Sequence, residues 1–252
     1  MGRAWTMSLN ESIKIFRCKT VDVEPLNDQI FRVRFRIADG SKLEFKGGQY
    51  IVLHMPDGKR VPLSIASAPQ ESFVELHIRL VEGHTLAQEM IDLFNSTSSF
   101  EIEGPCGGCF LKDNNRDIII IAGGTGFSPM KSLIECALAS QTKRQIKLYL
   151  GAQIFSDLYQ HELIEQWEID YDNFSYVPVI SGNDPEWQGE KGFPHIPAVQ
   201  QNRNNLSNTD FYISGSEPMV MAVYQELIDE NVDRSQIYSD ILNIKRENGE
   251  LK

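Results

Sequence analysis

A run of isoleucine that ends in a glycine-rich turn is the feature that most constrains the fold of this chain. Residues 117–122 read D-I-I-I-I-A, and G-G-T-G-F-S-P follows directly. Continuous apolar strands are typical of parallel sheets that are buried on both faces. Glycines permit positive φ and close approach of the backbone, so a sharp turn into a helix is expected here. The pattern therefore predicts a strand–turn–helix unit of an α/β domain.

The same turn is a predicted phosphate site. A helix that begins here directs its N–H groups and its dipole at an anion, and open α/β sheets bind ligands at the carboxyl ends of their strands. Gly123, Gly124 and Gly126 let the backbone approach a pyrophosphate, and Thr125 and Ser128 add hydroxyl donors. The spacing is neither G-x-G-x-x-G nor a P-loop, and an ordinary strand–helix connection is the alternative.

The chain falls into two parts with different strand and helix patterns, which meet near residues 113–116. Before them, short β-type runs alternate with turn residues, which is typical of an antiparallel barrel or sandwich. The predicted strands there are 13–23, 30–37, 50–54, 63–67, 73–80 and 100–102, with one helix at 86–95. After them, strands at 117–122, 146–151, 174–180, 210–214 and 236–239 alternate with helices at 128–139, 156–167 and 217–230. Such alternation predicts a parallel sheet with helices on both faces.

The predicted fold class is therefore α/β plus all-β. We expect an N-terminal antiparallel β-barrel domain over residues 8–113, followed by a doubly wound parallel-sheet nucleotide-binding domain over residues 114–245. The polar residues 245–252 are expected to be loose.

Composition excludes several classes of partner. Of 252 residues 41% are hydrophobic, which is enough for a core, and the net charge is −11. An acidic surface repels phosphate backbones and anionic lipid, so no nucleic acid or membrane partner is expected. No run reaches the ~18 apolar residues that a membrane span needs. The four cysteines form no secretory framework, so the expected compartment is the cytoplasm.

Three further segments make the pattern specific to one family. They are R-V-P-L-S-I-A-S-A-P at 60–69, G-P-C-G-G-C-F at 104–110 and F-Y-I-S-G-S-E-P-M at 211–219. Together with A-G-G-T-G-F-S-P at 122–129, they resemble in content and in order the motifs of the ferredoxin–NADP reductase superfamily. Within it, the chain resembles the small bacterial NAD(P)H:flavin oxidoreductases, including the reductases encoded with bacterial luciferase.

This resemblance implies a flavin on the barrel domain and NADH or NADPH on the α/β domain. It implies that the Ser64 hydroxyl is the catalytic group, hydrogen-bonded to the flavin nitrogen that accepts hydride. The implied cofactor-binding residues are Arg60, Pro62, Leu63, Ser64, Ile65, Ala66, Gly123, Gly124, Thr125, Gly126, Ser128, Pro129, Ser214, Gly215 and Met219. Binding that stacks two rings and excludes water then suffices for hydride transfer, with no metal and no acid–base pair.

The sequence departs from the family pattern at three points. The arginine expected three residues before Ser64 is Val61, and the one-residue offset of Arg60 is expected to turn it away from the flavin unless a bulge intervenes. The usual aromatic residue is Leu63. Flavin binding is therefore expected to be weak, so that FMN or riboflavin is an exchangeable substrate. FAD is disfavoured because no insert provides for its adenine half. Ser214 replaces a frequent cysteine beside the nicotinamide, which a serine can match in packing.

The nucleotide preference is open. Gln153 stands where many family members carry arginine, and residues 181–190 hold no lysine or arginine. NADP specificity needs cations on the 2′-phosphate, so NADH is at least as plausible as NADPH.

Other chemistry-bearing residues have ordinary explanations. Cys106 and Cys109 have no second close pair for zinc and do not begin a helix as redox pairs do. His77 is read as a polar-face residue of its strand, with an approach to the flavin as the alternative. Arg79 is a candidate for a flavin phosphate or ribityl group, and Trp187 is expected to cap a loop or to line the nucleotide entrance.

Three functions therefore compete. The first is a reductase that supplies reduced flavin to a partner monooxygenase such as luciferase. The second is a flavin-bound electron-transfer subunit that serves a protein acceptor. The third, kept open by Val61 and Leu63, is a non-catalytic nucleotide-binding regulator. No plant-type C-x₄-C-x₂-C…C spacing occurs, so no iron–sulfur domain is expected in this chain.

Overall fold

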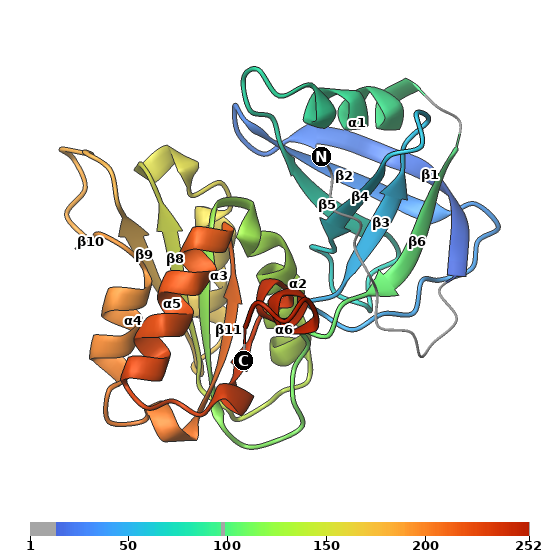
Figure 1. Ribbon diagram of the computed structural model, residues 1–252. Helices are drawn as coiled ribbons and strands as arrows, with labels where there is room; N and C mark the ends of the chain where they lie inside the picture. The colour runs from blue at the N-terminus through green and yellow to red at the C-terminus, as the bar shows by residue number, and fades with distance from the viewer. Residues whose placement is uncertain (1–13, 97–98, 252) are drawn as a thin grey trace.

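The computed structural model describes residues 14–96 and 99–251, which form two domains side by side (Figure 1). Residues 8–13 of the predicted barrel domain lie outside the described residues, as does residue 13 of its predicted first strand. The predicted boundary at 113–114 falls in the segment that joins the last barrel strand to the first parallel strand.

The N-terminal domain is one antiparallel sheet that curls on itself. Its strands are β1 (Lys14–Pro25), β2 (Ile30–Ile37), β3 (Tyr50–His54), β4 (Arg60–Ser64), β5 (Val74–Arg79) and β6 (Phe100–Cys106), in the order β4-β3-β6-β1-β2-β5. A single bridge between Ile65 and Leu76 joins the two edges and closes the barrel. Helix α1 (Thr85–Ser96) lies over the strands, and its Phe94 meets Phe100 edge to face at 4.9 Å (Figure 1).

The C-terminal domain is a parallel sheet covered on both faces. Its strands are β7 (Asp117–Gly123), β8 (Ile146–Ala152), β9 (Phe174–Ile180), β10 (Glu190–Lys191), β11 (Thr209–Ser214) and β12 (Ile237–Tyr238), in the order β10-β9-β8-β7-β11-β12. Its helices are α2 (Phe127–Ala139), α3 (His161–Asp170), α4 (His195–Asn202), α5 (Glu217–Asp229) and α6 (Asp240–Glu247). The predicted fold class, an antiparallel barrel followed by a doubly wound sheet, is thereby confirmed.

The isoleucine run explains why this sheet is covered twice. Successive side chains of a strand point to opposite faces. Ile118 and Ile120 pack with α2 and α3, whereas Ile119 and Ile121 pack with α4 and α5. Each strand residue is therefore buried whichever way it points, which favours an unbroken apolar sequence over an alternating one.

Several predicted boundaries differ from the structure. The strand predicted at 63–67 begins at Arg60 and ends at Ser64, because it pairs with β3 only over that range; the chain then crosses to β5, where Ala66 N–H donates to the Glu75 carbonyl at 2.7 Å. The helix predicted at 156–167 is a short turn at Phe155–Asp157 followed by α3. Helices α4 and α6 were not predicted.

The expectation of a loose tail is wrong for residues 245–251. Helix α6 continues to Glu247, Lys245 forms ion pairs with Glu217 at 2.5 Å and Glu250 at 3.0 Å, and Leu251 packs against the core. A polar segment can thus be fixed by ion pairs and one apolar anchor. Over the described residues, no helix is both long and apolar enough to cross a bilayer.

Candidate active site

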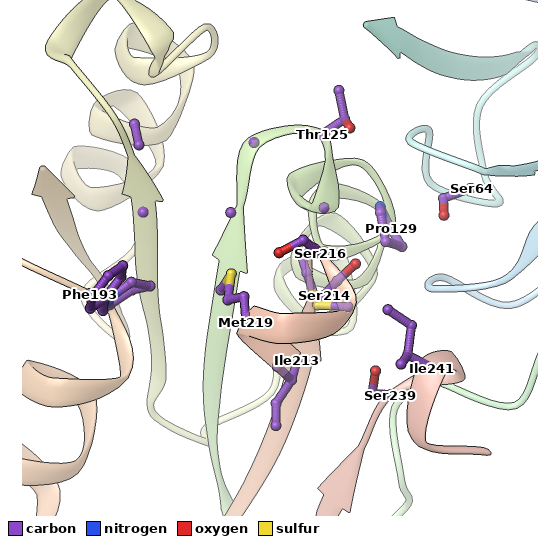
Figure 2. Close-up of a pocket in the computed structure, with 18 of the residues that line it drawn as sticks. Ser64, Thr125, Pro129, Phe193, Ile213, Ser214, Ser216, Met219, Ser239 and Ile241 are labelled. Atoms are coloured by element: carbon purple, nitrogen blue, oxygen red, sulfur yellow. The ribbon is translucent and has the colours of Figure 1, made fainter. Parts of the chain in front are cut away.

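A cleft of about 690 Å³ opens between the two domains. It lies at the carboxyl ends of β7, β8 and β11, where the sheet order reverses, since the chain runs outward from β7 to β10 and then returns to β11 beside β7. Open α/β sheets bind ligands at such reversal points, and the volume suits a small molecule. Ser64 faces this cleft from the barrel side, across from the glycine-rich turn (Figure 2).

The glycine-rich turn brings the start of α2 against the end of β11. Gly124 adopts a φ of +53°, and α2 begins at Phe127. A Cβ on Gly126 would lie 2.4 Å from the Ser214 carbonyl oxygen and 2.6 Å from the Gly215 nitrogen. Only glycine therefore allows the two backbone segments to meet this closely. The glycine-rich turn itself lines the cleft at the start of this helix, a kind of position that suits an anion.

The wall beside this turn is built from the end of β11 and the start of α5. Met219 lies over two glycines, because a Cβ on Gly123 or on Gly215 would each come within 2.7 Å of its sulfur. Ser214 and Ser216 project from the same wall (Figure 2). A thioether over glycine backbone leaves a flat and largely apolar surface, which suits a planar ring.

The structure brings most of the predicted nucleotide-binding residues together. The cleft is lined by Gly123, Gly124, Thr125, Gly126, Pro129, Ser214, Gly215 and Met219. Ser128 is buried and does not line it. Its position on α2 turns its hydroxyl toward the domain interior, which spacing alone did not reveal.

Of the residues predicted to bind flavin, Ser64 lines the cleft, as does Arg79, which was a candidate for a flavin phosphate or ribityl group. Ile65 and Ala66 are fully buried, and Leu63, with Val61, packs against the barrel core. By strand alternation Arg60 and Pro62 share the outer face with Ser64, but the Arg60 guanidinium forms an ion pair with Glu103 and stays outside the cleft.

Arg79 is the one lysine or arginine among the described residues that line the cleft. Its Nε and Nη2 donate to the Gln29 side-chain oxygen at 3.0 and 2.7 Å. Its Nη1 remains directed at the glycine-rich turn, 3.8 Å from where a Cβ of Gly124 would lie. A barrel residue thus adds positive charge to the helix start on the opposite domain. This cradle fits the phosphates of a nucleotide, and the Ser64 hydroxyl fits a polar ring edge.

Sequence reasoning missed the third wall of the cleft, formed by Ser239, Asp240 and Ile241 at the start of α6. The Asp240 carboxylate accepts a hydrogen bond from the Gly108 N–H at 3.1 Å, so it ties α6 to the linker between the domains. Burial raises the pKa of Asp240 to about 6, although the N–H groups of Gly108 and Cys109 oppose this. An acidic residue directly after the last parallel strand was the available signal.

Asp240 is expected to make stability depend on pH in the acid range. Its pKa in the folded state lies above the unfolded value of 3.8, so the folded protein binds the proton more tightly. This contribution is complete below about pH 4 and is lost as the pH rises through 6. The Asp240→Asn variant should gain on the order of 1–3 kcal/mol over wild type at pH 7.5, with the difference vanishing near pH 4. Urea unfolding at pH 4–8 measures this, with exposed Asp28→Asn as control; a constant difference would contradict it.

The cysteines at the end of β6 and in the linker that follows it are free thiols. Cys106 and Cys109 are both buried, and burial raises the pKa of Cys106 to about 11. Such a thiol is a poor nucleophile because little of it is thiolate at neutral pH. Within residues 14–96 and 99–251, no three His, Cys, Asp or Glu residues gather in a way that could hold a metal ion.

Two further predictions concern aromatic and histidine side chains. The reading of His77 as a polar-face residue is wrong, because Tyr159 of the other domain covers it and only 6% of the residue is exposed. Trp187 stacks on Phe155 at 5.7 Å, and its ring N–H donates to the Glu190 carbonyl at 2.8 Å. It thereby caps its loop and does not line the cleft.

Comparison with known proteins agrees with this architecture. Residues 17–110 match the oxidoreductase FAD-binding domain family, and residues 120–225 match the oxidoreductase NAD-binding domain family. The chain is 32% identical over 232 residues to a probable flavin reductase of Photobacterium leiognathi, covering 90% of this chain and 97% of that protein. It is 30% identical over 227 residues to an NAD(P)H-flavin reductase of Vibrio harveyi, covering 87% and 94%.

Other similar proteins carry the names of other reactions. The CDP-6-deoxy-L-threo-D-glycero-4-hexulose-3-dehydrase reductase of Yersinia pestis is 32% identical over 228 residues, which cover 90% of this chain and 68% of that protein. The solved structure of the Amycolatopsis cytochrome P450 reductase GcoB superimposes with a TM-score of 0.81 at 25% identity, covering 92% of this chain and 71% of that one. The chain therefore belongs to the ferredoxin–NADP reductase superfamily, as an oxidoreductase with a flavin-binding barrel and an NAD-binding α/β domain.

Proposed function

We propose that this enzyme transfers hydride from NADH or NADPH to FMN or riboflavin and releases the reduced flavin. One observation carries the proposal: Ser64 of the barrel lines the same cleft as the glycine-rich turn and the Ser214–Met219 wall of the α/β domain. A hydride donor and a hydride acceptor held on opposite walls of one cleft need little further catalysis. When bound, the nicotinamide supplies the hydride and the flavin accepts it.

The residues of the cleft would act by binding and orientation. The N–H groups of the turn and the Arg79 guanidinium hold the nucleotide phosphates. Gly215 and Met219 provide the flat surface for the nicotinamide, with the Ser214 hydroxyl at its edge. The Ser64 hydroxyl donates a hydrogen bond to the flavin nitrogen that receives hydride, and so favours the charge that develops there.

We expect the flavin to exchange because the barrel presents few side chains that could bind it. Arg60 forms an ion pair with Glu103, and the half-buried Leu63 packs against the barrel core. Few groups of this domain are therefore free to retain the phosphate or the ring. Reduced flavin that leaves the cleft would serve a flavin-dependent monooxygenase such as luciferase, in keeping with the sequence resemblance to luciferase-associated reductases.

A protein acceptor is the second candidate. It is favoured by the 32% identity to a reductase that is named for the dehydrase it serves. In that case flavin would stay bound and single electrons would pass to the acceptor protein. A flavin that survives gel filtration in stoichiometric amount would favour this function over the first.

The deciding experiment follows oxidation of NADH and NADPH with and without added riboflavin, FMN and FAD. Strict dependence on added flavin is the expected result, with FMN and riboflavin better than FAD. Oxidation at full rate without added flavin would support the electron-transfer subunit. Flavin binding without any oxidation would contradict both and favour a non-catalytic regulator.

Replacing Ser64 by alanine is expected to lower kcat/KM for the flavin about 10- to 100-fold. The variant loses one hydrogen bond to a centre that becomes charged in the transition state, which is worth about 1.5–3 kcal/mol. Ser72→Ala is the matched control, because Ser72 is an exposed serine of the same domain, outside the cleft. An unchanged rate in Ser64→Ala would remove Ser64 from the mechanism.

A further inference from the structure

The seam between the domains holds a buried polar cluster that the proposed chemistry does not use. This seam cluster consists of Glu75, His77, Lys131, Glu135 and Tyr159. Glu75, His77 and Lys131 are only 5%, 6% and 7% exposed. Burying charges is costly unless they are paired and hydrogen-bonded, so a cluster of this kind calls for an explanation.

Lys131 of α2 is the centre of the cluster. Its ammonium lies 3.3 Å from the Glu75 carboxylate of β5 and 2.9 Å from that of Glu135, one turn further along α2. It also donates to the Ala66 carbonyl at 3.3 Å. The three N–H donors of one ammonium thereby join α2 to two separate segments of the barrel.

The protons of the cluster can be assigned from its acceptors. The Glu75 carboxylate lies 3.0 Å from His77 Nε2 and can only accept, so His77 Nε2 donates. Nδ1 of the neutral ring then accepts from the Tyr159 hydroxyl at 3.0 Å. Burial lowers the pKa of His77, which agrees with a neutral ring. Burial raises the pKa of Glu75, but His77 and Lys131 outweigh it and lower that pKa to about 2.

The next residue of α2 makes a second attachment to the same strand end. The Ser132 hydroxyl donates to the Ser67 carbonyl at 2.6 Å, and both residues are buried. A Cβ on Gly47 would lie 2.8 Å from the Ser132 carbonyl oxygen, so barrel backbone also presses directly on this turn of the helix. Carbonyls are obligatory acceptors, and these two find their partners across the seam.

These attachments have a definite place relative to the cleft. Ala66 and Ser67 follow Ser64 by two and three residues, while Lys131 and Ser132 follow the glycine-rich turn by little more than one turn of α2. One rigid helix therefore connects the flavin wall of the cleft to its nucleotide wall. Its Lys131 and Ser132 side chains bind the barrel between these two walls.

We propose that Lys131 and Ser132 are positioning residues for hydride transfer, which they govern by setting the separation of the two cleft walls. The inference rests on the proposed function. In the transfer, the C4–H bond of the dihydronicotinamide breaks and an N–H bond forms on the flavin. The two electrons of this bond leave the nicotinamide, which is oxidised, and pass to the flavin, which is reduced; one proton from solvent completes the reduced flavin. The rate of such a step falls steeply with donor–acceptor distance.

The test is single-turnover reduction of FMN by NADH and by NADH deuterated at C4, in wild type and in Ser132→Ala, Lys131→Arg and Lys131→Met. We expect Ser132→Ala to slow transfer about 3- to 10-fold and Lys131→Met about 10- to 100-fold, with partial rescue in Lys131→Arg. The Kd of NADH should change less than about 3-fold, and the isotope effect should rise as transfer becomes limiting. Ser140→Ala is the matched control, because Ser140 also binds a carbonyl of α2 but lies away from the seam.

A second readout needs neither nucleotide nor flavin. Amide hydrogen exchange of residues 64–68 should accelerate several-fold in Ser132→Ala, while exchange in β2 stays unchanged. Unchanged transfer rates in the variants would overturn the inference, as would a loss of rate no larger than the loss of folded protein. If wild type itself fails to reduce any flavin, the proposed function fails instead, and the exchange measurement still tests the attachment.

Discussion

Replacing Gly126 by alanine is expected to abolish useful binding of the nicotinamide nucleotide. The added Cβ would lie 2.4 Å from the Ser214 carbonyl oxygen and 2.6 Å from the Gly215 nitrogen. These are backbone atoms of β11 and its end, so no flexible side chain can move aside. The backbone conformation of Gly126 itself, with φ −59°, would accept alanine. The whole cost therefore falls on the contact that shapes the phosphate cradle.

The expected size is a rise in the Kd for NADH of about 100-fold or more, or roughly 3 kcal/mol. Titration calorimetry measures it directly. Gly108→Ala is the control, since its φ is not positive and a Cβ there meets nothing closer than 3.5 Å. If Gly126→Ala binds NADH as wild type does, the turn and the end of β11 do not form the nucleotide site.

Replacing Gly48 by alanine is expected to be the most destabilising glycine-to-alanine substitution within residues 14–96 and 99–251. Gly48 has a φ of +100°, which side chains rarely adopt, and its Cβ would lie 2.0 Å from the Cys109 carbonyl oxygen. Two independent penalties therefore add, one from backbone strain and one from collision of the barrel with the linker. Relief requires the domains to separate at the cleft.

We expect a loss of at least about 3 kcal/mol in the free energy of unfolding, which for a chain of this size lowers Tm by roughly 6–12 °C. Gly40→Ala separates the two penalties, because Gly40 has a φ of +82° but nothing within 4 Å of its Cβ. It should cost only the strain, about 1–3 kcal/mol. Equal losses in the two variants would show that Gly48 makes no close contact at the seam.

How far the sequence predicts this protein depends on whether a residue is constrained by its own neighbours or by the other domain. The strands at 30–37, 50–54 and 174–180 were predicted to the residue, because each lies between clear turn signals and carries a local apolar pattern. The glycine-rich turn could be predicted equally well, because the residues that shape it are consecutive in the sequence. The order of the four motifs was sufficient to identify the family.

What could not be predicted is set by contacts between distant segments. His77 looks like a surface residue on its strand, but it is buried in the structure, where it contacts Tyr159, 82 positions away. Asp240 lines the cleft and accepts a hydrogen bond from the N–H of Gly108, which is 132 positions away. Leu63 was read as a missing aromatic wall for the flavin, whereas in the structure it is half-buried and packs against the barrel core. None of these arrangements leaves a periodicity in the sequence.

The attachment of α2 to the barrel also bears on how such enzymes can be recombined. A chimera that exchanges α/β domains between relatives at the linker would inherit a foreign partner for the Ala66 and Ser67 carbonyls, which here accept from Lys131 and Ser132. Even if both parents fold well, the chimera would then hold the flavin and nicotinamide rings at the wrong spacing. Transplanting residues 127–136 of α2 together with the barrel they touch keeps the spacing of the parent.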